Sequence, residues 1–320
     1  MLHVQTTVSQ PPVSAPDQHA PRNASRRSAG RRRGSANHPL TFLVPAFAMI
    51  IVFFVVPTVM NFIYPFTNWS AFKPGIQSAG LSNFRDIIND GTLVGSLKIT
   101  LIYAVLVALF QNLFGLALAL LLERDTRVNR FARALFFLPV LMSALAVGYV
   151  FQAMLKPDGA LNSVLSTLLG HHVAVEWLGS TTWTIVTIAL VHAWKWMGLA
   201  MLVYLAGLKT IPEDLQEAAR IDGAGRWKAF WHIRLPLLAP AVTFNVATAL
   251  LGTMNGFDVV QATTGGGPAR STEVLNIFIF RTFGQGLYAQ STAMSLVLFL
   301  SILVLAVPLV LFLRRREQIL

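Results

Sequence analysis

The chain has 320 residues, of which 54% are hydrophobic and only 12% are charged, and its formal net charge is +11. Because soluble domains carry about 25% charged residues, this composition excludes an ordinary soluble protein and indicates one that crosses a membrane several times. No cysteine is present, which excludes disulfides, thiol nucleophiles and cysteine-based metal sites.

Residues 1–39 are rich in Ser, Pro, Ala and Arg and show no apolar periodicity, so we expect a disordered basic cytoplasmic tail. The apolar run after the tail lacks a small-residue cleavage pattern, and we interpret it as an uncleaved first span. The arginines would hold the tail in the cytoplasm, and binding to anionic lipid headgroups is an alternative role for them.

Residues 40–320 are predicted to form one all-α domain, a polytopic membrane protein with six transmembrane helices. Each apolar run is long enough, as a helix, to cross the roughly 30 Å hydrocarbon layer of a bilayer. An even number of spans places the two termini on the same side. The predicted spans are residues 40–64, 97–122, 134–155, 182–206, 237–260 and 287–313.

The basic residues lie mainly at the ends of the apolar runs. The tail, the loop 123–133, the loop 209–234 and the C-terminus together carry three times as many Lys and Arg as the loops on the other side. Since cytoplasmic loops are enriched in Lys and Arg, both termini and these loops are predicted to be cytoplasmic. Because the positive charge is explained by membrane topology, we expect the lipid bilayer as a partner and do not expect the chain to bind nucleic acid.

The stretch Pro212–Pro236 is polar although it lies between two long apolar runs. Thr210 and Glu213 have the spacing of a capping box at the start of a helix, and Gly223 suits a C-cap with positive φ. A linker helix in the membrane interface would explain the aromatic residues that follow but not the small and acidic residues before them. A second helix would end at Pro236 and carry four residues on one face: Trp227, Phe230, Trp231 and Arg234.

The small and acidic residues of this stretch resemble the EAA loop of ABC importer membrane subunits. In the family pattern, EAA is followed by Gly and then, after a fixed gap, by I-x-LP. A second segment, Gly265–Pro268 with Ser271–Val274, is similar to the TxGGPxxxT segment of carbohydrate permeases of the maltose type, and the resemblance extends from Asn83 to the C-terminus. The residues in register with the EAA loop are Glu217, Ala218, Ala219, Asp222, Gly223, Ala224, Ile233, Leu235 and Pro236.

This resemblance implies the fold of a type I ABC importer membrane domain in a bacterial inner membrane. Residues 209–236 would form the coupling loop, docked on a cytoplasmic dimer of ATP-binding cassette ATPases. Glu217 would pair with a basic group of the ATPase, and Gly223 would set the docking angle. A second homologous permease subunit and an extracytoplasmic solute-binding protein would complete the importer.

The chain contains no phosphate-binding motif of the form GxxxxGK followed by Ser or Thr. We therefore expect this subunit not to be an enzyme and to carry no cofactor, with ATP-Mg bound by the partner ATPase. Metal-binding and hydrolase motifs are also missing from the sequence, so we expect no catalytic, cofactor-binding or metal-binding residue.

Lys195 is the one charged residue well inside a predicted span, and it lies between two tryptophans. A charge at that depth is costly and usually faces protein or a water-filled path. We therefore predict that Trp194, Lys195 and Trp196 line the translocation path, where aromatic faces stack on sugar rings. The alternative is that Lys195 pairs with a buried carboxylate such as Asp258, or with carbonyls, and only holds the helices together.

The fifth predicted span contains further polar candidates. Because maltose-type permeases contact sugar from this region, the resemblance implies that Thr253, Asn255 and Gly256 contact the substrate. The alternative for these residues is hydrogen bonding between helices. Gln111 and Asn112 in the second span are expected to make such packing hydrogen bonds.

The predicted function is that of a membrane-spanning permease subunit of an ATP-driven, solute-binding-protein-dependent importer for a sugar or oligosaccharide. One alternative keeps this class and changes the cargo to glycerol phosphate, a polyol or another small polar solute. A second alternative is a secondary transporter driven by an ion gradient. The sequence disfavours the second because it has no inverted repeat and no acidic residue at the middle of a span.

Overall fold

The computed structural model describes residues 43–317, so the predicted tail of residues 1–39 lies outside the described part. Within residues 43–317 the regular structure is helical, with one isolated bridge between Thr67 and Ser78, and the predicted all-α class is confirmed. The chain divides into two units, residues 1–50 and residues 51–320. The elements are α1 (Val44–Ile50), η2 (Ile51–Val55), α2 (Val56–Ile63), η3 (Tyr64–Phe66), α3 (Ser82–Asn89), α4 (Thr92–Leu121), α5 (Arg127–Leu141), α6 (Ala144–Met154), α7 (Ala160–Leu169), α8 (Thr184–Lys209), α9 (Glu213–Ile221), α10 (Arg226–Ala229), η4 (Phe230–Arg234), α11 (Leu235–Leu237), α12 (Ala239–Met254), α13 (Asp258–Thr263), α14 (Leu275–Gly284) and α15 (Tyr288–Glu317).

By length and composition, four helical stretches of the described chain could each cross a membrane. Two further pairs of helices are bent in the middle, and the number of spans reaches six if each bent pair crosses once. The four unbroken stretches are Val44–Phe66, Thr92–Leu121, Thr184–Lys209 and Tyr288–Leu313, and the bent pairs are Arg127–Leu141 with Ala144–Met154 and Arg226–Leu237 with Ala239–Met254.

The first bent pair replaces the continuous helix that the sequence predicts over residues 134–155. The axes of α5 and α6 meet at 98° because Met142 takes an extended backbone conformation, with φ −75° and ψ 148°. Pro139, two residues before the end of α5, does not itself break that helix. The break leaves the last carbonyls of α5 without partners in their own helix.

The second bent pair corrects the expected end of a helix at Pro236. Pro236 instead lies in the first turn of α11, and Pro240 lies in the first turn of α12, where a missing N–H disrupts nothing. The chain bends by 67° between α11 and α12, at Leu238. Likewise α12 ends at Met254, so the last part of the predicted span 237–260 belongs to the separate helix α13.

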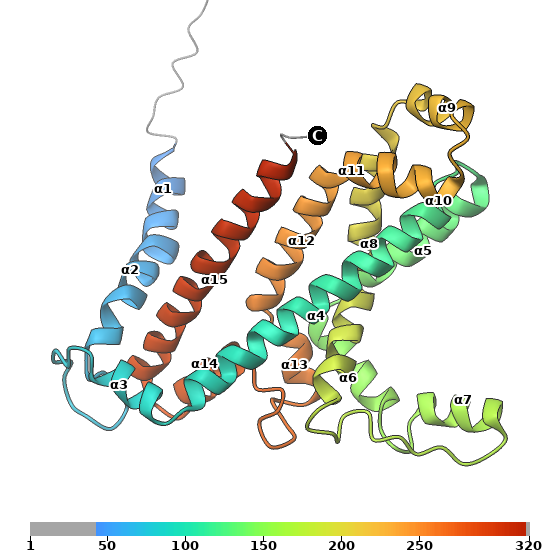
Figure 1. The fold of residues 1–320 in the computed structure, drawn as a ribbon. Coiled ribbons are helices and arrows are strands. Elements are labelled where there is room, and N and C mark those ends of the chain that lie inside the picture. Colours follow the sequence, from blue (N-terminus) through green and yellow to red (C-terminus); the bar gives the residue numbers. More distant parts are fainter. Residues whose placement is uncertain (1–42, 318–320) are drawn as a thin grey trace, which may run out of the picture. The chain divides into compact units, whose positions relative to one another are not determined.

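Helix α8 lies at the centre of the second unit, beside α4 and α5 (Figure 1). Small residues let these helices approach closely: a Cβ on Gly115 of α4 would lie 2.6 Å from the Cβ of Ala200, and one on Gly198 would lie 2.3 Å from the carbonyl oxygen of Phe136. As a result, 61% of the apolar window of α8 is buried, against 6% for α15, whose apolar surface is left for lipid.

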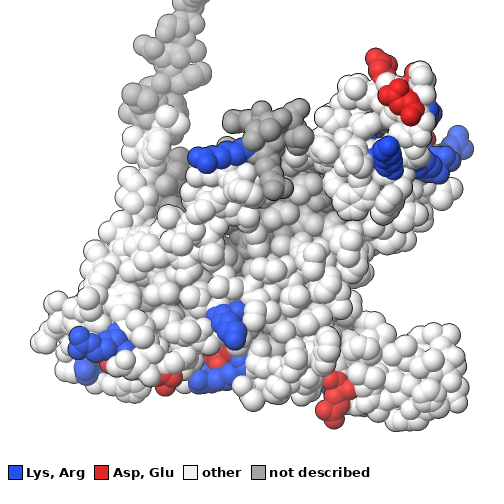
Figure 2. Space-filling view, viewed as in Figure 1, with Lys and Arg blue, Asp and Glu red and all other residues white. Residues whose placement is uncertain are grey.

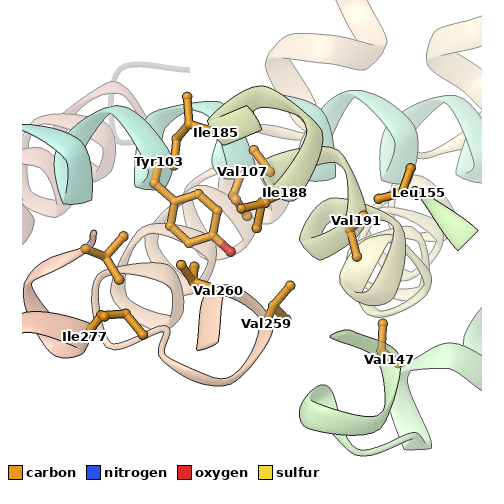
Figure 3. Packing of buried hydrophobic residues seen from close by; sticks show 12 residues of the cluster. Tyr103, Val107, Val147, Leu155, Ile185, Ile188, Val191, Val259, Val260 and Ile277 are labelled. Carbon is orange, nitrogen blue, oxygen red and sulfur yellow. The ribbon is translucent and has the colours of Figure 1, made fainter. Parts of the chain in front are cut away.

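One apolar cluster joins α8 to the helices around it (Figure 3). Tyr103 and Val107 of α4 pack with Ile188 of α8, and α13 adds Val259 and Val260. The contact of α6 with α13 is close because α6 carries a glycine, Gly148, where a Cβ would lie 2.4 Å from that of Ala262.

Charged side chains lie toward the two ends of the long helices, with a broad uncharged band between them on the face shown in Figure 2. One end carries α9, α10 and the C-terminal end of α15, and the other carries α3, α7 and the turn before α14 (Figure 1). This distribution is typical of a protein whose middle is surrounded by lipid.

Candidate functional site

Helix α9 begins differently from the sequence prediction. Its N-cap is Pro212, and no side chain caps its first N–H groups, so the predicted capping box of Thr210 and Glu213 is wrong. Thr210 is instead the C-cap of α8, and its hydroxyl donates a hydrogen bond of 2.8 Å to the carbonyl of Gly207. Helix α8 continues to Lys209, so Thr210 directly follows its last residue. The Thr210 hydroxyl therefore bonds to a carbonyl of α8 and is not available to cap α9.

The C-terminus of α9 is closed by the backbone conformation of Gly223. Its φ is +75°, and the expected C-cap with positive φ is confirmed. The Ala224 N–H donates to the Ala219 carbonyl at 2.8 Å and the Gly223 N–H donates to the Arg220 carbonyl at 3.1 Å, which together make a Schellman motif. A Cβ on Gly223 would meet no neighbouring atom, so glycine is required there by φ and not by space.

The surface of α9 faces away from the described chain. Glu217, Ala218, Asp222 and Gly223 are exposed, whereas Ala219 is buried. Ile221 is 86% exposed, so a large apolar side chain lies on the surface of α9 beside these polar residues. An exposed helix with an acidic and an apolar part has the composition of a docking surface.

We call the C-terminal part of the predicted coupling loop its base, and this base is attached to the turn between α4 and α5. Arg234 Nη2 lies 2.5 Å from Glu123 Oε1. Arg133 donates to the carbonyl of Leu122 at 2.6 Å and so satisfies the C-terminus of α4. The other residues of the family pattern, Ala224, Ile233, Leu235 and Pro236, are half-buried along this base.

The expected second helix places its aromatic side chains together, although the helix itself is interrupted by the π-helical turn η4. The rings of Trp227 and Trp231 lie 5.7 Å apart, and Phe230 lies 5.4 Å from Trp231. We call Trp227, Phe230 and Trp231 the aromatic cluster.

A cavity of about 320 Å³ lies between α4, α6, α8 and α12. Four of the six predicted path residues line it: Trp196, Thr253, Asn255 and Gly256. Sequence reasoning did not assign several other polar lining residues to the path, namely Tyr103, Gln111, His192, Thr248 and Asp258.

The sequence did contain one signal for these missed residues, because some of them are spaced so that they share a helix face. His192 and Trp196 are one turn apart on α8, and Tyr103 and Gln111 are two turns apart on α4. The Tyr103 hydroxyl and His192 Nδ1 are 2.8 Å apart and bridge the two helices. Gln111, expected to make a packing hydrogen bond, lines the cavity, whereas Asn112 behaves as expected and accepts a hydrogen bond of 2.6 Å from Tyr204.

Trp194 and Lys195 are not among the residues that line this cavity. Trp194 packs edge-on against Phe151, with ring centroids 5.1 Å apart. Lys195 is 2% exposed and donates a hydrogen bond of 3.3 Å to the Val140 carbonyl at the end of α5, while its ammonium lies 4.3 Å from the centre of the Trp196 ring. This geometry matches the alternative in which Lys195 contacts carbonyls and holds the helices together.

At the end of the molecule opposite to α9, residues Thr264–Glu273 form what we call the glycine turn. The Thr264 and Thr272 hydroxyls are 2.8 Å apart, and Thr272 also donates to the Gly267 carbonyl at 2.6 Å. The carboxylate of Glu273 is 1% exposed and lies 2.6 Å from Arg281 and 3.2 Å from Arg270. The sequence does not predict this ion pair, because Arg281 reaches Glu273 from a separate helix, α14.

The fold and these sites define a polytopic membrane protein of the transporter class, with a partly polar cavity among its spans and an exposed helix beyond them. The chain belongs to the family of binding-protein-dependent transport system inner membrane components, which matches residues 111–318. Membership confirms the predicted resemblance.

Individual relatives agree over most of the chain. The multiple sugar-binding transport system permease protein MsmF of Streptococcus mutans is 29% identical, with 83% of this chain and 92% of MsmF covered. The probable ABC transporter permease protein YurN of Bacillus subtilis is 31% identical, with coverages of 84% and 93%. A chain in the crystal structure of a bacterial alginate ABC transporter, in complex with an alginate pentasaccharide-bound periplasmic protein, is 25% identical with a TM-score of 0.71, covering 87% of this chain and 94% of that one.

Proposed function

We propose that this chain is the permease subunit of an ATP-driven bacterial importer that moves a sugar or oligosaccharide across the inner membrane into the cytoplasm. The observation that carries the coupling part of the proposal is α9, whose Glu217 and Ile221 are exposed at the end of the molecule predicted to be cytoplasmic. A dimer of ATP-binding cassette ATPases would bind this helix and hold ATP-Mg, since the chain has no phosphate-binding motif of its own.

The cavity supports a hydroxyl-rich cargo. Its volume of about 320 Å³ is at the lower end of small-molecule sites, which span about 300–1,000 Å³. Trp196 contributes an aromatic ring, and Gln111 and Asn255 offer amide groups that can donate to and accept from hydroxyls. The sugar and alginate systems of the relatives described above support the same class of cargo.

A second homologous permease subunit would stand beside this chain, and an extracytoplasmic solute-binding protein would deliver the cargo to the end that carries the glycine turn. The alginate importer in complex with its periplasmic protein supports this last partner. In this arrangement closure of the ATPases would move α9, and the base of the coupling loop would pass the movement to the α4–α5 turn through Arg234 and Glu123.

The test is reconstitution of the assembled importer with its ATPase, sister subunit and binding protein in proteoliposomes. We expect ATP-dependent uptake of labelled maltooligosaccharide or of another sugar, and no uptake by this chain alone under an ion gradient. Uptake of glycerol phosphate in place of sugars would change the cargo but keep the class. Gradient-driven uptake by the isolated chain would contradict the proposal.

Glu217→Gln tests the coupling role directly. Because a hydrogen bond to a charged group contributes about 1.5–3 kcal/mol, we expect ATPase binding to weaken by about tenfold or more. Glu213→Gln is the matched control, since Glu213 is an exposed acid on the same helix but outside the family pattern. Equal loss in both variants would argue against a specific contact at Glu217.

A further inference from the structure

A second cavity, separate from the one among the spans, lies against the turn between α4 and α5. Its volume is about 680 Å³, and Arg226 of α10 closes it from the side of the coupling loop. This end of the molecule also carries α9 (Figure 1). The lining residues are Ala117, Leu120, Leu121, Glu123, Arg124, Thr126, Asn129 and Arg226.

The charge of this second cavity is positive. Its one acidic residue, Glu123, is already paired with Arg234 at 2.5 Å. Arg124 and Arg226 are exposed, and neither takes part in the ion pairs formed within residues 43–317. The cavity therefore offers two guanidinium groups, which bind phosphate groups well because each can donate two parallel hydrogen bonds.

The remaining lining has a polar part, Thr126 and Asn129, and an apolar part that belongs to the last turns of a membrane-spanning helix. Ala117, Leu120 and Leu121 come from α4, and Leu121 is 75% exposed. Next to Arg226, the aromatic cluster exposes Trp227, at 74%, and Trp231. Tryptophan is enriched at the headgroup level of membranes, so both features place the second cavity at the boundary between hydrocarbon and water.

We propose that the second cavity binds an anionic glycerophospholipid from the leaflet on the α9 side. The lipid phosphate would contact Arg124 and Arg226, and an acyl chain would lie along Ala117 and Leu121. A free phosphate could use the two guanidinium groups but would leave the apolar part uncovered, so the lining as a whole fits a lipid. A bound lipid would also join α10 to the α4–α5 turn beside the base of the coupling loop.

The test measures binding of phosphatidylglycerol and phosphatidylcholine to the purified full-length chain by native mass spectrometry. We expect preference for phosphatidylglycerol and loss of that preference in the double variant R124Q/R226Q. Since each basic side chain near an anionic surface increases affinity about fivefold, the expected loss is about 25-fold. The matched control is R127Q/K228Q, which removes two exposed basic side chains outside the cavity and should change affinity less than twofold.

A second variant tests the apolar part of the site. Ala117→Trp should weaken phosphatidylglycerol binding, because Ala117 is exposed toward the cavity and an indole would fill it. Millimolar inorganic phosphate should not displace the lipid. Equal losses in the two double variants, displacement by inorganic phosphate, or unchanged binding by Ala117→Trp would each overturn the proposal.

The same variants distinguish a lipid from a protein partner. Circular dichroism and elution volume should match those of the unmodified chain, which shows that the variants are folded. If R124Q/R226Q instead weakens ATPase binding while phosphatidylglycerol affinity stays unchanged, the second cavity belongs to a protein interface and the lipid proposal is wrong.

Discussion

Two segments of this chain resemble family patterns, and they differ in where their polar groups point. In α9, Glu217 is exposed and meets no basic partner within the described residues. In the glycine turn, Glu273 is buried and lies between Arg270 and Arg281. The difference teaches that the acidic residue of one pattern stays on the surface, where the proposed partner would bind, whereas that of the other is paired within the fold, although both look alike as strings of small and acidic residues.

Breaking the glycine turn should have the largest effect on stability. Glu273→Ala would leave Arg281 near a buried site without its partner, and we expect a loss of about 2–4 kcal/mol, below the usual value for a fully buried pair because both arginines are partly exposed. Thermal unfolding in detergent measures it. The exposed Asp86→Ala on α3 is the control and should change the free energy of unfolding little. Equal stability of the two variants would contradict the assigned role.

Much of the fold follows from the apolar runs, but the breaks do not. A run of about 20 apolar residues predicts a span wherever it occurs. Local residues mark some of these breaks, since Pro236 and Pro240 flank the bend at Leu238 and Gly256 follows α12 closely. Such residues are also tolerated inside continuous membrane helices, so whether the helix breaks depends on how the helices pack. The sequence therefore predicts continuous helices over 134–155 and 237–260, and the structure divides each of them.

Among the site residues, too, features set by neighbouring residues in the sequence are predictable, whereas contacts between separate helices are not. The positive φ of Gly223 is predictable, because helix C-caps are encoded within a few residues. The partner of Lys195 is not, since the Val140 carbonyl is free only because α5 ends shortly after it. Tyr103 and His192 likewise meet although they are 89 positions apart in the sequence.

Breaking the C-cap of α9 should have an intermediate and local effect. Gly223→Ala places a Cβ at a φ of +75°, which costs about 1–2 kcal/mol for an L-residue. Hydrogen exchange of the backbone amides at positions 222–224 should be about tenfold faster, with global unfolding nearly unchanged because α9 is exposed.

The control for that prediction lies two residues away. Gly225 has an ordinary φ of −64° and, like Gly223, open space around its Cβ position. Gly225→Ala should therefore leave exchange at the end of α9 unchanged. Faster exchange in both variants would show that added volume, not backbone conformation, disturbs the loop.

The ion pair between Glu123 and Arg234, which links the predicted coupling loop to the α4–α5 turn, should contribute less to stability than the two features above. Glu123 and Arg234 are only partly exposed and lie 2.5 Å apart, so a double-mutant cycle of Glu123→Gln and Arg234→Gln should give a coupling energy of about 1 kcal/mol. The same cycle on Asp125 and Arg130, which are exposed and 3.8 Å apart, should give about 0–0.5 kcal/mol. Equal coupling energies would remove the proposed mechanical role of the Arg234 contact.

The smallest effect on stability should come from Glu217→Gln, although it is expected to disturb coupling most directly. An exposed carboxylate without an ion pair in the described chain leaves nothing unsatisfied when it is neutralised, so the free energy of unfolding should stay within about 0.5 kcal/mol of the unmodified chain. The same detergent unfolding experiment used for Glu273 checks this. A loss above about 1 kcal/mol would mean that Glu217 supports the fold, and the contrast between α9 and the glycine turn would then be wrong. Unchanged unfolding together with weakened ATPase binding would separate the two glutamates by function, because only one of them would act through a partner.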